Sequence, residues 1–180
     1  MKCWGSDAYG QLGDGSTTDS LSPVAVAGLT GATAISAGHE FACALLAGGA
    51  VRCWGHNESG ELGNGSTTDS SSPVSVSGIS HATAVSAGGS QACAVLTGGT
   101  VDCWGYNGFG ALGNGSTTSS SVPVVVTGLS GATGIAAGIY HSCALLVGGY
   151  VDCWGYNGFG ELGNGTTTTS SIPVVVTGLP

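Results

Sequence analysis

Seven cysteines are the residues with the clearest capacity for chemistry in this chain of 180 residues. Six of them form three pairs at the same spacing: Cys43 with Cys53, Cys93 with Cys103, and Cys143 with Cys153. A Gly-Gly dipeptide inside each pair predicts a β-hairpin that sets the two cysteines face to face. Directly opposed residues on antiparallel strands have Cβ atoms about 4.5–5.5 Å apart, and the closest pairs reach disulfide geometry. We therefore predict three cross-strand disulfides and an oxidising compartment, with buried thiols as the alternative. Cys3 is left over, either unpaired or bonded between molecules.

No catalytic or metal-binding residues are predicted. The histidines do not suggest a shared site, because His39, His56, His81 and His141 fall at four different places in the repeat described below. Zinc is disfavoured because the chain has no Cys-x-x-Cys pair. Asp102 and Asp152 hold equivalent places in neighbouring units, so we expect them to lie too far apart for paired-carboxylate catalysis. The chain is expected not to be an enzyme.

Two loops rich in oxygen atoms, residues 14–19 (DGSTTD) and 64–69 (NGSTTD), superficially resemble calcium-binding loops. They lack the spaced acidic series and the closing glutamate of an EF-hand. Ser, Thr, Asn, Asp and Gly are also the ordinary residues of turns. We expect no cofactor, with calcium at these loops as the alternative.

The charge balance excludes several classes of partner. Only Lys2 and Arg52 are basic, against ten acidic residues, and the formal net charge is -8. Nucleic acids and anionic membranes bind through Lys and Arg, so neither is an expected partner. No apolar run approaches the roughly 18 residues of a membrane-spanning helix, and the first residues are not expected to be a signal peptide.

These residues are carried by a unit of fifty residues that repeats along the chain. Cys-Trp-Gly begins at Cys3, Cys53, Cys103 and Cys153, and 22 of the 26 positions in 104–129 are identical in 154–179. We expect residues 1–180 to form a single repeat domain. Its units are expected at about 4–53, 54–103 and 104–153, with a partial unit at 154–180 and residues 1–3 as an orphan last strand.

Each unit is expected to contain four short strands. In the first unit these are residues 23–26, 32–37, 42–46 and 51–54. Short strands with a turn every 8–12 residues are typical of all-β folds, and the fifty-residue period favours a β-propeller. The predicted fold class is therefore all-β, with propeller blades of four antiparallel strands. The chain would be an open arc of three blades plus two odd strands, unless oligomerisation completes the ring.

The unit resembles the repeat of the regulator of chromosome condensation family. That pattern combines Trp-Gly-x-Asn, Gly-x-Leu-Gly-x-Gly, a Pro-x-x-Val strand, Ala-Gly-x-x-His-x-x-Ala-Leu and Gly-x-Val. Here these motifs are residues 104–107, 110–115, 123–126, 137–145 and 149–151. The family's histidine is present only at His141, because Phe41 and Gln91 replace it. The resemblance implies propeller blades, usually seven to a ring. It does not bring the family's nucleotide-exchange activity, because no matching site residues are present.

Positions that differ between near-identical units are not needed by the repeat framework, which makes them candidates for recognition. Tyr and Phe are enriched in the cores of interfaces, and packing between blades is their alternative role. The predicted partner-binding residues are Tyr9, His39, Phe41, His56, Tyr106, Phe109, Tyr140, His141, Tyr156 and Phe159.

The resulting functional hypothesis is a non-enzymatic protein-interaction scaffold, extracellular or at the cell surface. The alternative is a structural repeat protein that assembles into rings or filaments by end-to-end blade pairing. The expected partner is accordingly another protein or a second copy. The chain is expected to be a homo-oligomer or a fragment of a longer propeller.

Overall fold

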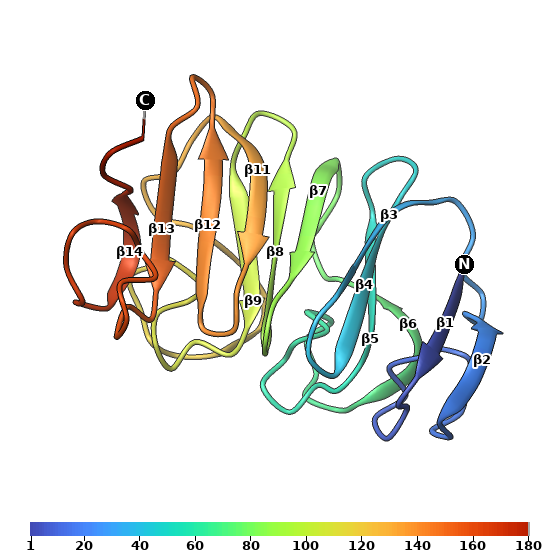
Figure 1. The fold of residues 1–180 in the computed structure, drawn as a ribbon. Helices are drawn as coiled ribbons and strands as arrows, with labels where there is room; N and C mark the ends of the chain where they lie inside the picture. The colour runs from blue at the N-terminus through green and yellow to red at the C-terminus, as the bar shows by residue number, and fades with distance from the viewer. Residues whose placement is uncertain (180) are drawn as a thin grey trace.

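Fourteen β-strands build the computed structural model of the protein, which describes residues 1–179. They form three four-stranded antiparallel sheets and one two-stranded sheet, placed side by side along an open arc (Figure 1). The half-blade contains β1 (Lys2–Gly5) and β2 (Ser20–Ala25). The first blade contains β3 (Ala32–Ala37), β4 (Phe41–Leu46), β5 (Val51–Gly55) and β6 (Ser70–Ser75). The second blade contains β7 (Ala82–Ala87), β8 (Gln91–Leu96), β9 (Val101–Gly105) and β10 (Ser120–Val125). The third blade contains β11 (Ala132–Ala137), β12 (His141–Leu146), β13 (Val151–Gly155) and β14 (Ser170–Val175).

The all-β propeller fold and the open arc are confirmed, but the blades begin at a different point of the repeat from the predicted one. Each blade starts with the Ala-Thr strand and ends with the proline-containing strand, so the prolines lie on edge strands. Proline has no N–H to donate and is confined to such edges in sheets. The prediction of residues 1–3 as an orphan last strand is wrong, because β1 pairs with β2 as the outer half of a blade. No helix long and apolar enough to cross a membrane occurs within residues 1–179.

The three cysteine hairpins have the predicted register. In the first blade Cys43 on β4 pairs with Cys53 on β5. Leu45 pairs with Val51 in the same hairpin, nearer to the turn. The S–S distances in the three blades are 2.09, 2.08 and 2.11 Å, so the three disulfides are confirmed. Cys3 is the one free cysteine among the described residues. Burial raises the pKa of its thiol above the ordinary cysteine value.

A long loop joins the third and fourth strands of each blade and folds around a buried side chain. In the first blade this side chain is Asn57, whose Oδ1 accepts a bond of 2.9 Å from the Leu62 backbone N–H. Its Nδ2 donates to the carbonyl oxygens of Ser66 and Thr68. The second and third blades repeat the arrangement with Asn107 and Asn157, whereas the half-blade has Asp7. The loops are thereby fixed on one face of the arc, at the bottom of Figure 1.

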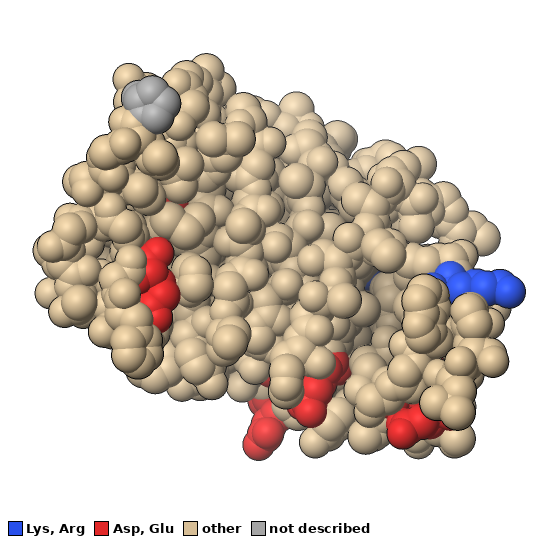
Figure 2. Space-filling model, in the orientation of Figure 1, with Lys and Arg blue, Asp and Glu red and all other residues tan. Residues whose placement is uncertain are grey.

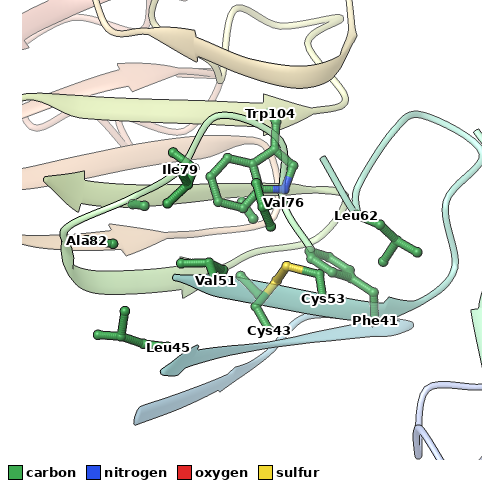
Figure 3. Packing of buried hydrophobic residues seen from close by; sticks show 13 residues of the cluster. Phe41, Cys43, Leu45, Val51, Cys53, Leu62, Val76, Ile79, Ala82 and Trp104 are labelled. Carbon is green, nitrogen blue, oxygen red and sulfur yellow. A yellow bond between two sulfur atoms is a disulfide. The ribbon is translucent and has the colours of Figure 1, made fainter. Parts of the chain in front are cut away.

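The core lies between neighbouring blades. Trp104 on β9 is fully buried against the first blade, and its Nε1–H donates a bond of 2.8 Å to the Glu61 carbonyl. Trp54 and Trp154 make the same bond to Gln11 and Ala111, at 2.9 and 2.8 Å. Figure 3 shows the indole of Trp104 packed with Val76 and Ile79, in the cluster that also contains the Cys43–Cys53 disulfide. Each junction therefore joins one unit's long loop to the next unit's tryptophan.

Candidate binding surface

Five aromatic side chains form one continuous cluster on the loop face, which we call the aromatic surface. It consists of Tyr106, Phe109, Tyr140, Tyr156 and Phe159. Phe109 is at its centre, with ring centroids 5.2 Å from Tyr140, 5.1 Å from Tyr156 and 6.2 Å from Tyr106. Tyr156 and Phe159 are 6.3 Å apart. Rings at these separations and tilted angles attract one another beyond their simple burial.

The cluster spans the junction between the second and third blades. Tyr106 and Phe109 come from the loop after β9, whereas Tyr156 lies in the loop after β13. Tyr140 comes from the turn between β11 and β12. The same contact across a junction pairs Tyr9 with His56, with centroids 4.6 Å apart. The repeat geometry therefore sets side chains of successive units against each other on this face.

In the long loops of the second and third blades, a glycine stands two residues after the tyrosine and close to its hydroxyl. A Cβ added at Gly108 would collide with the Tyr106 hydroxyl, and one at Gly158 would collide with the Tyr156 hydroxyl. In the first blade the tyrosine is replaced by His56, and Glu58 stands at the glycine position. The Tyr-Asn-Gly sequence therefore lets each phenol lie flat against its own loop.

A hollow of about 420 Å³ opens at the aromatic surface. Its lining contains Phe109, Ile139, Tyr140, His141, Tyr156, Phe159 and Glu161. Phe159 is 89% exposed and Ile139 is 65% exposed, so apolar rings and methyl groups face the solvent here. Glu161 holds the loop in shape, because its Oε2 accepts a bond of 2.9 Å from the Phe159 backbone N–H. The hollow has the size and character to take an apolar side chain of a partner.

Tyr9 and His56 form a smaller second patch on the same face. His56 Nδ1 lies 3.7 Å from Glu61 Oε1, and His56 Nε2 lies 3.9 Å from Glu58 Oε2. Glu61 is almost fully buried, and this burial raises the pKa of its carboxyl above the ordinary glutamate value. Its Oε2 still accepts a bond of 2.8 Å from the Ser59 backbone N–H.

Two of the predicted residues lie outside these patches, and one of them is a correction. His39 is exposed beside Glu40 and lines a separate hollow together with Gly88 and Ile139. Phe41 is only 2% exposed and belongs to the core between the first and second blades, so it cannot contact a partner. Phe41 is buried because a side chain at this position of the blade points across the junction to the next blade. The equivalent Gln91 does the same, and it donates to the Gly138 and His141 carbonyls. His141, at the same position of the third blade, lines the hollow.

Sequence reasoning missed Ile139, Glu61 and Glu161. Ile139 falls at a variable position of the repeat, where the other units have His39 and Gly89. That variability was the available signal. The two glutamates give no such signal, because their burial and loop bonds depend on the fold of the loop.

The surface is largely uncharged. On the face that Figure 2 draws, the acidic atoms lie mainly in groups along the lower edge, and the visible basic atoms lie at the end where the half-blade is. Among residues 1–179 no three His, Cys, Asp or Glu side chains are grouped to hold a metal ion. The exposed rings and methyl groups of the aromatic surface are suited to apolar and stacking contacts.

The fold and this loop face define a protein built of tandem propeller blades. The family model of the regulator of chromosome condensation (RCC1) repeat matches residues 3–45, 48–95, 99–145 and 149–180. A second model of the same repeat matches residues 32–61, 82–111 and 132–161. The chain belongs to the RCC1 repeat family. No curated protein sequence matches it.

Solved structures of similar fold include human WBSCR16, with a TM-score of 0.84 and 24% identity over 96% of this chain and 46% of that one. Prp20p of Saccharomyces cerevisiae gives a TM-score of 0.85 at 19% identity, over 97% of this chain and 45% of that one. Yeast RCC1 (Prp20) bound to Kap60 gives a TM-score of 0.81 at 19% identity, over 97% of this chain and 44% of that one. At these identities the likeness shows the fold alone. The chain spans less than half the length of each of these proteins.

Proposed function

We propose that the chain is a non-enzymatic protein-interaction scaffold, outside the cytoplasm, that binds a protein partner through the aromatic surface. Residues 1–180 act as one repeat domain in this proposal. The observation that carries it is the continuous aromatic cluster across the second and third blades, with its apolar hollow. The three disulfides support the location, because such bonds persist in oxidising compartments. Protein binding also fits the yeast relative, whose structure was solved with Kap60 bound.

The test uses peptides selected from a random peptide library on the wild-type chain. The disrupting variant is Phe109→Ser with Tyr140→Ser, which removes the centre of the aromatic surface. The matched control is Val147→Ser, because Val147 is 70% exposed on the opposite face. We expect the dissociation constant of the selected peptides to rise at least about tenfold in the disrupting variant, as for loss of an interface hot spot. The control should bind as the wild type does. Equal binding by all three proteins would refute the proposal.

A second candidate function, end-to-end self-assembly, is favoured by the tryptophan of the half-blade. Trp4 is 64% exposed, whereas the equivalent Trp54, Trp104 and Trp154 are fully buried. Each buried indole donates to the long loop of the preceding unit. At the other end of the arc, the Glu161 carbonyl accepts no indole bond among the described residues. A second copy docked end to end would bring Trp4 to Glu161 and lead to rings or filaments.

Light scattering on the 180-residue chain separates these possibilities. Self-assembly predicts a mass that grows with concentration and returns to the monomer value in Trp4→Ser. A monomer at every concentration would refute self-assembly. That result would agree with a scaffold, or with an arc whose ends meet further units of a longer propeller.

A further inference from the structure

The rings that line the hollow of the aromatic surface are steeply tilted against one another. The angle between the ring planes is 57° for Phe109 and Tyr140, and 67° for Phe109 and Tyr156. Between Tyr156 and Phe159 it is 64°. Aromatic rings attract a cation through their negative faces, and several rings around one space form the cages that bind quaternary ammonium groups. The four rings around this hollow of about 420 Å³ are therefore suited to a positively charged group.

A carboxylate shares the hollow with the rings. Glu161 belongs to the lining, and its Oε2 accepts a bond of 2.9 Å from the Phe159 backbone N–H. This bond fixes the direction of the carboxylate. Within residues 1–179 no side chain or backbone group donates a hydrogen bond to its other oxygen, Oε1. The hollow thus combines aromatic walls with a negative group that has an oxygen available to a donor.

The first blade shows what the equivalent carboxylate contacts there. Glu61 keeps the same loop bond, because its Oε2 accepts from the Ser59 backbone N–H at 2.8 Å. Its Oε1 lies 3.7 Å from His56 Nδ1, and the His56 ring packs against Tyr9 with centroids 4.6 Å apart. A ring nitrogen therefore faces this carboxylate beside an aromatic ring. In the third blade Tyr156 stands in the place of His56 and has no nitrogen to offer.

The basic residues of the chain itself do not supply a cation to the hollow. Lys2 is on β1 and Arg52 is on β5, and neither belongs to the lining. Ten acidic residues against these two give a formal net charge of -8. A charge of this sign attracts positively charged partners and repels negatively charged ones. A cation in the hollow must therefore come from another molecule.

We propose that the hollow receives an arginine side chain of the protein partner, with the guanidinium against the rings and hydrogen-bonded to Glu161. This inference rests on the proposed function, because the arginine belongs to the partner that binds the aromatic surface. Arginine fits better than lysine because its planar guanidinium stacks on aromatic rings and has five N–H donors for a carboxylate. Its aliphatic part packs on apolar walls such as Ile139 as leucine would, while its charge meets Glu161.

The test titrates the whole chain with the peptide acetyl-Gly-Arg-Gly-amide and follows chemical shifts by NMR. Three further peptides have citrulline, lysine or leucine in place of the arginine. Citrulline has nearly the shape of arginine without its charge. The titrations are made at pH 8, because a protonated His141 in the lining would repel the guanidinium. We expect the citrulline peptide to have a dissociation constant at least about fivefold higher than the arginine peptide, with the lysine peptide between them.

Two variants separate the contribution of the carboxylate from that of the rings. Glu161→Gln removes the charge and keeps an oxygen that can accept from the Phe159 backbone N–H. It should raise the dissociation constant of the arginine peptide about 5- to 10-fold and leave that of the citrulline peptide unchanged. The matched control Glu58→Gln makes the same change of net charge at a side chain that is 87% exposed and outside the hollow, so it should bind as the wild type does. Phe159→Leu keeps an apolar side chain without the ring, and it should reduce the preference for arginine over citrulline.

Several results would overturn the inference. One is a leucine peptide that binds as tightly as the arginine peptide. If that leucine peptide loses affinity in Phe109→Ser with Tyr140→Ser, the proposed function stands and only the arginine is refuted. Arginine binding that is unchanged in Glu161→Gln would also overturn it. So would equal losses of the arginine and citrulline peptides in that variant, because a disturbed loop and not the charge would then explain them. A wild type that binds none of the four peptides would refute it as well.

Discussion

Replacing Trp104 by phenylalanine tests the central claim about the junctions, that each indole locks one blade to the loop of the preceding one. The substitution removes the Nε1–H that donates to the Glu61 carbonyl at 2.8 Å. A buried acceptor left without its partner costs about 1–3 kcal/mol. The smaller ring also leaves a cavity, because Trp104 is fully buried, and large-to-small changes in a core add about 1 kcal/mol or more. We expect the free energy of unfolding to fall by about 3 kcal/mol.

The same substitution at Trp4 provides the control. Trp4 has the same place in its unit, but its side chain is largely exposed. Surface changes of this kind usually stay within about 0.5 kcal/mol. Both variants are compared with the wild type by urea unfolding followed by far-UV circular dichroism. Equal losses in the two variants, or a loss below about 1 kcal/mol in Trp104→Phe, would refute this account of the junctions.

Four further outcomes are expected. Cys43→Ala with Cys53→Ala opens a crosslink between residues ten positions apart, so chain entropy predicts a loss of about 3 kcal/mol in urea unfolding. Alkylation of the untreated protein without reductant should label Cys3 alone, and labelling of all seven cysteines would disprove the disulfides. Because burial raises the pKa of Glu61, the folded state holds more protons than the unfolded state between the two pKa values. The free energy of unfolding should therefore fall as the pH rises through that window. Glu61→Gln should flatten this dependence, which is measured as melting temperature against pH. An unchanged slope in the variant would show that Glu61 is not the source of the dependence. Gly108→Ala should displace the Tyr106 hydroxyl, and a peptide that binds the aromatic surface as tightly as before would contradict the close contact found there.

Much of this fold follows from local signals in the sequence. A Gly-Gly turn between apolar strands determines which residues of a hairpin face each other, so the pairing of Cys43 with Cys53 could be predicted. The number of strands follows equally from alternation and turns. The blade boundary could not be predicted in this way, because a fifty-residue period is the same wherever the count begins. The edge position of the prolines was the one physical signal that would have settled it.

The aromatic surface was less predictable, because it is made by contacts across junctions. Variability between units selected Phe109 and Tyr156, but their stacking depends on the rotation from one blade to the next. Phe41 satisfied the same criterion and proved to be buried, since its side chain points towards the following blade.

The fixed spacing of the junction contacts has a consequence for how such genes change. A recombination between two equivalent codons of neighbouring units deletes or duplicates fifty residues, wherever in the unit the crossover falls. Each tryptophan then still lies 43 residues after the carbonyl it bonds, as in the present chain. Each cysteine pair is also kept ten residues apart. The arc can therefore lengthen or shorten by whole blades in one genetic event, without any blade losing a partner that its fold requires.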